Sequence, residues 1–358
     1  MDVYQKLQQK LNAHPTSAPD HPEILEILRI LFTPEEAELA LHLLFSPKPV
    51  DNIAQEAALP VDKVTALCEQ LADKGVVLSH RHHDKKAYML APPMPGVFEY
   101  PIMKRKHLDL DFERLTQLWV QYYDAAWGRE LHGSKTSMFR IIPVQKAIPS
   151  TQRVLPFEEA SHYIDIADSI AVGDCACRVA QKKCDNPIEV CLSLDGAARL
   201  LVERKIARFI TRQEALNILE ETEKAGLVHL TVNATDKIGL ICSCCPCCCV
   251  ALGAITRLKD TTSHPMSNFY ATVNVEDCNA CGICEDRCPV KAINLADVAI
   301  VDVRLCIGCG LCGSACPTGA ISLNRRADSA EPPLQGKELS LRVAQEKGRL
   351  DDFWANLK

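Results

Sequence analysis

The sequence lacks the features of membrane-spanning, nucleotide-binding and nucleic-acid-binding proteins. It has no uninterrupted apolar run of about 18 residues, so no membrane span is expected. Its first residues lack the apolar core of a secretory signal peptide, and we expect a cytoplasmic protein. No G-x-G-x-x-G follows a predicted strand and there is no P-loop, so no nucleotide or flavin site is visible. The net charge of −6 argues against general binding of nucleic acid.

Cysteine, by contrast, is abundant: the 358 residues include 19 cysteines. They are clustered rather than dispersed, and without a signal peptide such clusters indicate metal ligation, not disulfides. Iron–sulfur centres are damaged by oxygen, so we expect the protein in an anaerobe or a protected compartment.

Eight of the cysteines form two copies of one pattern. The first reads Cys278-x2-Cys281-x2-Cys284-x3-Cys288-Pro289, and the second reads Cys306-x2-Cys309-x2-Cys312-x3-Cys316-Pro317. This is the bacterial-type pattern for two 4Fe–4S clusters, in which the fourth cysteine of each run ligates the other cluster. One cluster is therefore expected on Cys278, Cys281, Cys284 and Cys316, and the other on Cys306, Cys309, Cys312 and Cys288. Zinc knuckles do not duplicate such a pattern with crossed ligation.

Ten further cysteines lie upstream in two sets. The first set has the spacing C-x-C-x6-C-x6-C and the second packs six thiols into eight residues: Cys175, Cys177, Cys184 and Cys191, then Cys242, Cys244, Cys245, Cys247, Cys248 and Cys249. Adjacent cytosolic thiols are a liability unless they are ligated or redox-active. We interpret the two sets as ligands of one or two further iron–sulfur clusters, and leave open which of the ten ligate. A structural zinc site and a dithiol redox site are the alternatives.

Two local expectations accompany these sets. Arg178 either donates a hydrogen bond to a cluster sulfide or makes a surface ion pair. Val250, Leu252, Ile255 and Leu258 predict an amphipathic helix that opens at residues 247–249, where its dipole would favour thiolates. Strands are predicted at 227–232 and 238–241.

The predicted fold class is a multidomain α+β protein. Residues 1–100 form a winged-helix-like domain, 101–265 a mixed α/β cysteine-rich domain, 266–326 a ferredoxin-like dicluster domain, and 327–358 a helical tail. In the first domain, Thr33 caps a helix that begins at Pro34. A helix over 61–74 ends at Gly75, and strands at 76–79 and 87–90 flank a basic loop with three histidines, which we expect to be solvated.

The winged-helix-like domain is expected to dock on protein rather than on DNA. Residues 1–100 carry 14 acidic and 9 basic side chains. The helix that would read DNA contains Asp62, Glu69 and Asp73, whereas phosphate neutralisation requires a basic face.

Residues 271–324 closely resemble the two-cluster bacterial ferredoxins, with all eight ligand positions in agreement. The resemblance implies one-electron transfer at low potential. A longer pattern is similar to a group of multi-cluster 4Fe–4S binding proteins of anaerobes. It begins at Gly173-Asp174-Cys175-x-Cys177-Arg178, continues through 242–249 and ends in this module. No activity carries over from that group. The paired Cys-Cys-Gly motifs of heterodisulfide-reductase clusters are absent.

The leading interpretation is an iron–sulfur electron-transfer protein or subunit that passes single electrons between its clusters and a partner oxidoreductase. The acidic surface of the ferredoxin-like region suits a basic redox partner. One alternative is a reductase whose catalytic centre lies within 175–249. Another is a redox-sensing regulator that binds DNA.

Overall fold

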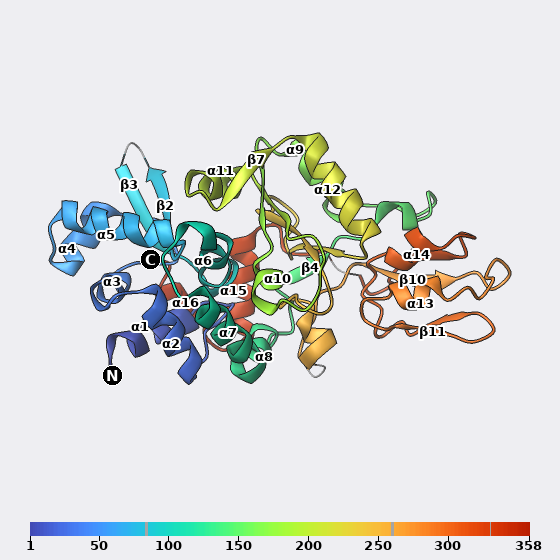
Figure 1. Ribbon diagram of the computed structural model, residues 1–358, viewed down its shortest axis with the longest axis horizontal. Helices are drawn as coiled ribbons and strands as arrows, with labels where there is room; N and C mark the ends of the chain where they lie inside the picture. Colours follow the sequence, from blue (N-terminus) through green and yellow to red (C-terminus); the bar gives the residue numbers. More distant parts are fainter. Residues whose placement is uncertain (83–84, 259–260, 330) are drawn as a thin grey trace.

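The computed structural model describes residues 1–82, 85–258, 261–329 and 331–358. Figure 1 shows an elongated molecule with the N-terminal helices at one end, a sheet in the centre and the ferredoxin-like hairpins at the other end. Residues 83–84, at the tip of the expected basic loop, lie outside the described ranges, and the side chains of 81–85 are not described either. Every helix in the described ranges is too short or too polar to cross a bilayer.

The N-terminal region combines five helices with a small sheet. Its core is made of apolar residues at helical spacing, such as Leu7 and Leu11 or Ile24 and Leu28. The Thr33 hydroxyl accepts from the Glu36 backbone N–H, as predicted, although that helix ends at residue 40. The sheet order is β1-β3-β2. The elements are α1 (Val3–Asn12), α2 (Pro22–Leu31), α3 (Pro34–Ala40), β1 (Lys48–Pro49), α4 (Val50–Ala57), α5 (Val61–Lys74), β2 (Val77–His82) and β3 (Lys85–Leu90).

A second helical layer joins this region to the centre. It consists of α6 (Glu99–Met103), α7 (Phe112–Tyr122) and α8 (Gly128–Leu131). The apolar side chains of α7 and of the π-helical turn Tyr123–Trp127 that follows it belong to the core: Trp119 and Trp127 lie buried with ring centroids 5.2 Å apart.

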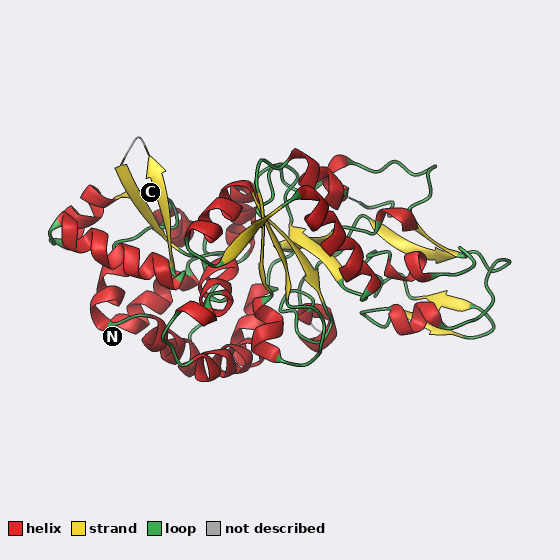
Figure 2. Ribbon diagram, turned by 45° about the horizontal axis from the view of Figure 1, so that its top comes forward, coloured by secondary structure: helices red, strands yellow, loops and turns green. Residues whose placement is uncertain are grey.

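The central sheet has six strands in the order β4-β8-β9-β6-β5-β7, and all of its neighbouring pairs are antiparallel. Figure 2 shows these strands between helices. The strands are β4 (Phe139–Ile141), β5 (Ile170–Asp174), β6 (Glu189–Leu194), β7 (Ala207–Ile210), β8 (Val228–Val232) and β9 (Leu240–Cys244). The helices are α9 (Ala160–Ile166), α10 (Ala176–Gln181), α11 (Asp195–Glu203) and α12 (Arg212–Lys224).

The two faces of this sheet differ in chemistry. Side chains alternate along a strand, so Leu192 of β6 and Ile241 of β9 share one face, where they pack with residues of α9 and α12. Cys191 and Cys242 are one step out of phase with them and therefore lie on the opposite face, toward α7 and α10. The sheet thus carries cysteines on one face and an aliphatic core on the other.

The ferredoxin-like region repeats one small unit. Helices α13 (Ile283–Arg287) and α14 (Leu311–Ala315) pack together, and each is followed by a short strand. Strands β10 (Phe269–Val273) and β13 (Ile321–Arg325) form one antiparallel pair, and β11 (Ile293–Leu295) and β12 (Ala299–Val301) form another.

The C-terminal tail returns to the N-terminal region. It forms α15 (Gly336–Glu346) and α16 (Leu350–Ala355), with Gly348 in the left-handed conformation between them. Figure 1 shows both helices beside the N-terminal helices. Arg349 donates to the Glu130 carboxylate at 2.7 Å and to the Asn12 carbonyl at 2.7 Å, which ties the tail to two earlier segments.

Candidate iron–sulfur and metal centres

The cysteines of the ferredoxin-like region line two separate cavities. One cavity is lined by Cys278, Cys281, Cys284 and Cys316, and the other by Cys288, Cys306, Cys309 and Cys312. Each cavity thus combines three cysteines of one run with the fourth cysteine of the other run. We call Cys278, Cys281, Cys284 and Cys316 the outer set. The other four, Cys288, Cys306, Cys309 and Cys312, are the inner set.

The two sets differ in exposure. In the outer set Cys281 is exposed and Cys278 and Cys316 are partly exposed. All four cysteines of the inner set are buried, with 7–8% of each residue exposed. The access of solvent and of partner proteins influences both the reduction potential and the reactivity of a cluster. The two cavities therefore offer different environments to the same kind of cofactor.

Backbone amides reach the inner set. Ala271 N–H donates to Cys306 Sγ at 3.4 Å, and Ala292 N–H donates to Cys288 Sγ at 3.2 Å. Gly308 has φ of +67°, and a Cβ there would lie 2.0 Å from the Phe269 carbonyl oxygen. This loop therefore requires glycine for both its conformation and its packing. The thiols and amides together fit a 4Fe–4S cluster, whose sulfurs are stabilised by such hydrogen bonds.

The inner set faces the central region. Val144 N–H donates to the Cys309 carbonyl at 2.9 Å, and Cys309 belongs to the same apolar core as Cys244 and Cys249. Burial raises the pKa of Cys309 to about 12, so a bound cation is needed to hold it as a thiolate. On the neighbouring helix, Arg287 donates to the Glu223 carbonyl of α12.

The ten upstream cysteines divide differently from the two sets in the sequence. Cys184 joins Cys245, Cys247 and Cys248 in a group whose four sulfurs all lie within 4.8 Å of one another. We call it the tight group. Cys245 and Cys248 are buried, and Cys184 and Cys247 are partly exposed.

The other six cysteines form a row of neighbours on the cysteine-bearing face of the sheet, which we call the six-cysteine group. Cys191 Sγ lies 4.0 Å from Cys242 Sγ because β6 pairs with β9 at this register. The contacts then run from neighbour to neighbour in the order Cys242, Cys244, Cys249, Cys177 and Cys175. A register shift between Gly173 and Asp174 precedes Cys175 and redirects the chain into α10.

The thiols of the six-cysteine group polarise one another. Hydrogen bonds with Cys191 and Cys244 hold the pKa of Cys242 well below its usual range, and those with Cys177 and Cys244 do the same for Cys249. The same contacts raise the pKa of Cys177, Cys191 and Cys244 well above the usual range, so lowered and raised values alternate along the group. Six such sulfurs in one buried site are suited to bind a cationic cluster or ion.

Arg178 lies between the two upstream groups. It is 3% exposed, so the expected alternative of a surface ion pair is wrong. Nη1 donates to the Ser243 carbonyl at 2.8 Å, whereas Nε and Nη2 find no nitrogen or oxygen acceptor among the described residues. Cys175 and Cys245 are the thiols whose charges act most strongly on the guanidinium.

Sequence reasoning missed two residues beside the six-cysteine group. Glu99 is enclosed near Cys242 and Cys175, and burial raises its pKa to about 8. Its carboxylate accepts from the Gly96 N–H at 2.8 Å. Tyr100 lies near Cys191. Both residues belong to a proline-rich stretch, where no spacing or motif signals a site.

The helix predicted to open at residues 247–249 begins later than expected. Residues 246–248 and 250–252 form turns, and a short π-helical segment follows at Ala254–Leu258. The Val250 carbonyl accepts from Tyr123 Oη at 2.6 Å and lies 3.1 Å from His132 Nε2. These two side chains provide the polar contacts of the Val250 carbonyl, which directly follows Cys249 in the chain.

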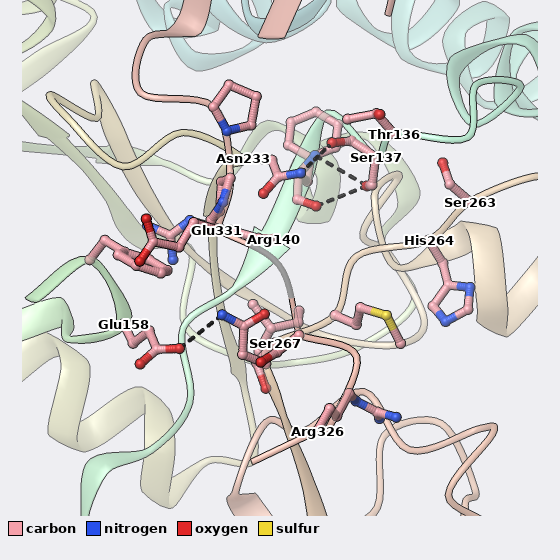
Figure 3. Close-up of a pocket in the computed structure, with 18 of the residues that line it drawn as sticks. Thr136, Ser137, Arg140, Glu158, Asn233, Ser263, His264, Ser267, Arg326 and Glu331 are labelled. Carbon is pink, nitrogen blue, oxygen red and sulfur yellow. Dashed lines mark hydrogen bonds between the residues drawn. The ribbon is translucent and has the colours of Figure 1, made fainter. Parts of the chain in front are cut away.

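A separate cavity of about 450 Å³ lies between β4 and the ferredoxin-like region. Figure 3 shows Arg140, Ser263, His264 and Arg326 among the residues around it. Arg140 Nε, Ser263 Oγ and His264 Nε2 are buried and have no hydrogen-bond partner among the described residues. Arg326 donates to the Cys306 carbonyl, which links this cavity to the inner set.

The comparisons with known proteins agree with the cysteine geometry of the C-terminal half. The family of the 4Fe-4S binding domain matches residues 271–294 and 299–322 as two adjacent motifs. No curated protein matches the sequence. The chain therefore carries two 4Fe–4S clusters in this region, and the upstream cysteine groups could hold further centres. These features indicate an iron–sulfur electron-transfer role.

Proposed function

We propose that the protein passes single electrons between a partner oxidoreductase, which docks at the outer set, and a further centre at the six-cysteine group. A bound 4Fe–4S cluster supplies one-electron redox chemistry at low potential. The observation that carries the proposal is the contrast in exposure: the outer set reaches the surface, whereas the inner set is buried against the central region.

The cavities support a ligand assignment for the two clusters. Cys278, Cys281, Cys284 and Cys316 are proposed to hold one cluster, and Cys288, Cys306, Cys309 and Cys312 the other. The crossed lining of the two cavities supports this arrangement, because each contains the fourth cysteine of the opposite run.

The surface around the outer set suits a partner protein. Ile283 and Leu295 line the outer cavity and are also exposed, and Ile300 nearby is 55% exposed. Exposed apolar side chains gathered near acidic ones are typical of an interaction site. The acidic residues of this region are Glu276, Asp277, Glu285, Asp286, Asp297 and Asp302. A basic redox partner is therefore expected.

Anaerobic oxidation by cytochrome c, a basic one-electron acceptor protein, tests the proposal. The protein is first reduced with titanium(III) citrate, and the reduction of the haem is then followed at several salt concentrations. Each electron that leaves the reduced protein reduces one ferric haem. We expect a rate that falls as salt rises, because the docking surface is acidic.

The control compares two cysteines. Cys281→Ser removes a ligand of the outer set and should slow haem reduction at least about tenfold, because one electron step is lost at the docking surface. Cys68→Ala removes a buried cysteine that lies outside all four groups and should leave the rate unchanged. Equal rates for Cys281→Ser and the wild type would contradict the proposal.

A second candidate function is the reduction of a small anion bound in the 450 Å³ cavity. The unpartnered Arg140 Nε, Ser263 Oγ and His264 Nε2 are the observation that favours it, because unpaired buried polar atoms call for a ligand or water. Oxidation of the reduced protein by nitrite, by sulfite and by an anionic disulfide tests it. A rate that saturates with one of these, and that Ser263→Ala lowers, would support this function over a pure electron carrier.

We also propose the four-part division at residues 1–100, 101–265, 266–326 and 327–358, with a winged-helix arrangement in the first part. The order α3-β1-α4-α5-β2-β3 and the sheet order β1-β3-β2 support that arrangement. Arg204 contacts Glu69 and Asp73 of α5, which favours docking of this helix on the central region over DNA binding. Absence of salt-dependent binding to duplex DNA is the expected outcome.

A further inference from the structure

The tight group differs from every other cysteine set in the spacing of its sulfurs. Cys184 Sγ lies 3.8 Å from both Cys245 Sγ and Cys248 Sγ, and Cys247 Sγ lies 3.7 Å from Cys248 Sγ. Three of the four ligands come from one turn after β9, and Cys184 comes from the segment after α10.

Three of the six sulfur–sulfur separations match those of four ligands on one metal ion, and all six are within 4.8 Å. With metal–sulfur bonds of about 2.3 Å, the sulfurs of a regular tetrahedron lie about 3.8 Å apart. In a 4Fe–4S cube each thiolate binds a different iron, so the four thiolate sulfurs surround the whole cube and are necessarily wider apart.

The ferredoxin-like region supplies an internal comparison. Among the described residues, neither the outer nor the inner set contains three ligand atoms within 4.8 Å of one another, although each set lines a single cavity. The six-cysteine group does not contain three such atoms either. The chain therefore has three open arrangements and one compact one.

We propose that Cys184, Cys245, Cys247 and Cys248 bind a single tetrahedral metal ion, Zn²⁺ or Fe²⁺, and not a 4Fe–4S cube. Four sulfur ligands in a tetrahedron are typical of these two ions. The proposal is independent of the electron-transfer function, because no ligand of the outer or inner set takes part.

The surroundings are suited to the negative charge of such a site. Four thiolates around a divalent ion carry a net charge of about −2. Arg178 is buried beside Cys245 with Nε and Nη2 lacking any nitrogen or oxygen acceptor in the described part of the chain. The backbones of Lys183 and Asn186 lie beside Cys248 and Cys184. A site of this kind is stabilised by donors directed at its sulfurs.

The ion would have a structural role. Residues 182–187 between α10 and β6 have no helix or strand of their own, and Cys184 is the cysteine that ties them to the turn after β9. Two ligands of the group, Cys245 and Cys248, pack with buried Leu227. Metal binding at such a loop contributes directly to folding. The six-cysteine group alone then remains for a further iron–sulfur centre.

Metal analysis of the full-length protein, purified anaerobically, tests the proposal. We expect about one zinc per chain, or one iron in excess of the cluster iron. For zinc, X-ray absorption at the zinc edge should show four sulfur ligands and no iron neighbour. For iron, the iron of the two ferredoxin-like clusters dominates the iron edge, so Mössbauer spectra should show one high-spin ferrous site with four sulfur ligands apart from the cluster iron. Absence of zinc, together with iron that is present in clusters alone, would overturn the proposal.

Matched variants locate the ion. Cys247→Ser should remove that one metal ion and leave the cluster iron and the cluster EPR signals unchanged, and Cys68→Ala should remove nothing. If Cys247→Ser does not fold, the zinc-edge and Mössbauer data on the wild type still decide between one ion and a cube. Loss of about four irons from a folded Cys247→Ser protein would show a cube and overturn the proposal. Loss of no metal would overturn it as well.

Discussion

The ferredoxin-like region and the central region both gather cysteines, but they do so by different means. In the former, short loops place three sulfurs of each set, and the packing of α13 on α14 brings in the fourth. In the latter, antiparallel register places Cys191 of β6 beside Cys242 of β9, although 50 residues separate them in the chain. The difference teaches that ligand spacing in the sequence identifies a site only where the site is made by local chain geometry.

The same contrast appears in the spacing of the sulfurs. The sulfurs of the outer and inner sets are widely spaced, as a cube requires. The central region contains the tight group beside the more widely spaced six-cysteine group. One region therefore repeats a single kind of site, whereas the other combines two kinds.

The largest effect is expected at the loop of Gly308, where both the backbone conformation and the packing exclude a side chain. Gly308→Ala should destabilise the ferredoxin-like region by about 3 kcal/mol or more, because the new Cβ meets the Phe269 carbonyl at a left-handed φ. About four irons per chain should be lost, and signals from the central region should remain. Anaerobic iron analysis with thermal unfolding measures both.

The first repeat provides the control for this substitution. Ala280 occupies the position equivalent to Gly308 and has φ of +52°. Ala280→Gly should change stability by less than about 1 kcal/mol and keep all iron. A similar loss of iron in both variants would mean that these loops tolerate no change at this position, and the close approach of the Phe269 carbonyl would then not explain the loss at Gly308.

A smaller effect is expected when the sheet is weakened instead of a loop. Leu192→Ala removes a fully buried side chain next to Cys191, on the opposite face of β6, and should cost about 3 kcal/mol. The centre at the six-cysteine group should lose occupancy before the two ferredoxin-like clusters do, as EPR during denaturant titration can show. Ile188→Ala, at a residue 42% exposed before the same strand, should cost less than about 1 kcal/mol. Simultaneous loss of all centres would show that the two regions fold as one unit.

The sequence predicted the local features and missed the long-range ones. The helix over 61–74 with its Gly75 end, and the eight-cysteine pattern matched by the 4Fe-4S binding domain, depend on neighbouring residues. The division of the ten upstream cysteines into groups depends on strand pairing. The sequence spacing therefore places Cys184 and Cys191 in one set, although they belong to different groups in the structure. Glu99 was missed because burial near thiols leaves no local pattern.

The contact between the N-terminal and central regions should have a moderate effect. Arg204 donates to Glu69 at 2.8 Å, to Asp73 at 3.2 Å and to Ser79 Oγ at 2.7 Å. Its side chain is only 10% exposed, so Arg204→Ala should cost about 2 kcal/mol. Arg208→Ala breaks an ion pair between half-exposed groups and should cost less than about 1 kcal/mol. Urea unfolding of both variants measures the difference, and equal costs would mean that Arg204 does not join the two regions.

The smallest effect concerns the pH dependence of the same contact. Burial raises the pKa of Glu69, but hydrogen bonds from Lys86 and Tyr88 of β3 and from Arg204 outweigh it and lower the pKa to about 2. The stabilisation by this carboxylate is therefore complete above its ordinary pKa of 4.5 and is lost as the pH falls toward 2. Glu69→Gln should cost about 1 kcal/mol at neutral pH, and that difference should stay constant down to about pH 5. Anaerobic urea unfolding of both proteins between pH 7 and pH 3 measures the difference, which should begin to shrink below about pH 5. A difference that stays constant down to about pH 3 would show a carboxylate with the same pKa in the folded and the unfolded protein, and the contact between the two regions would then not depend on its charge.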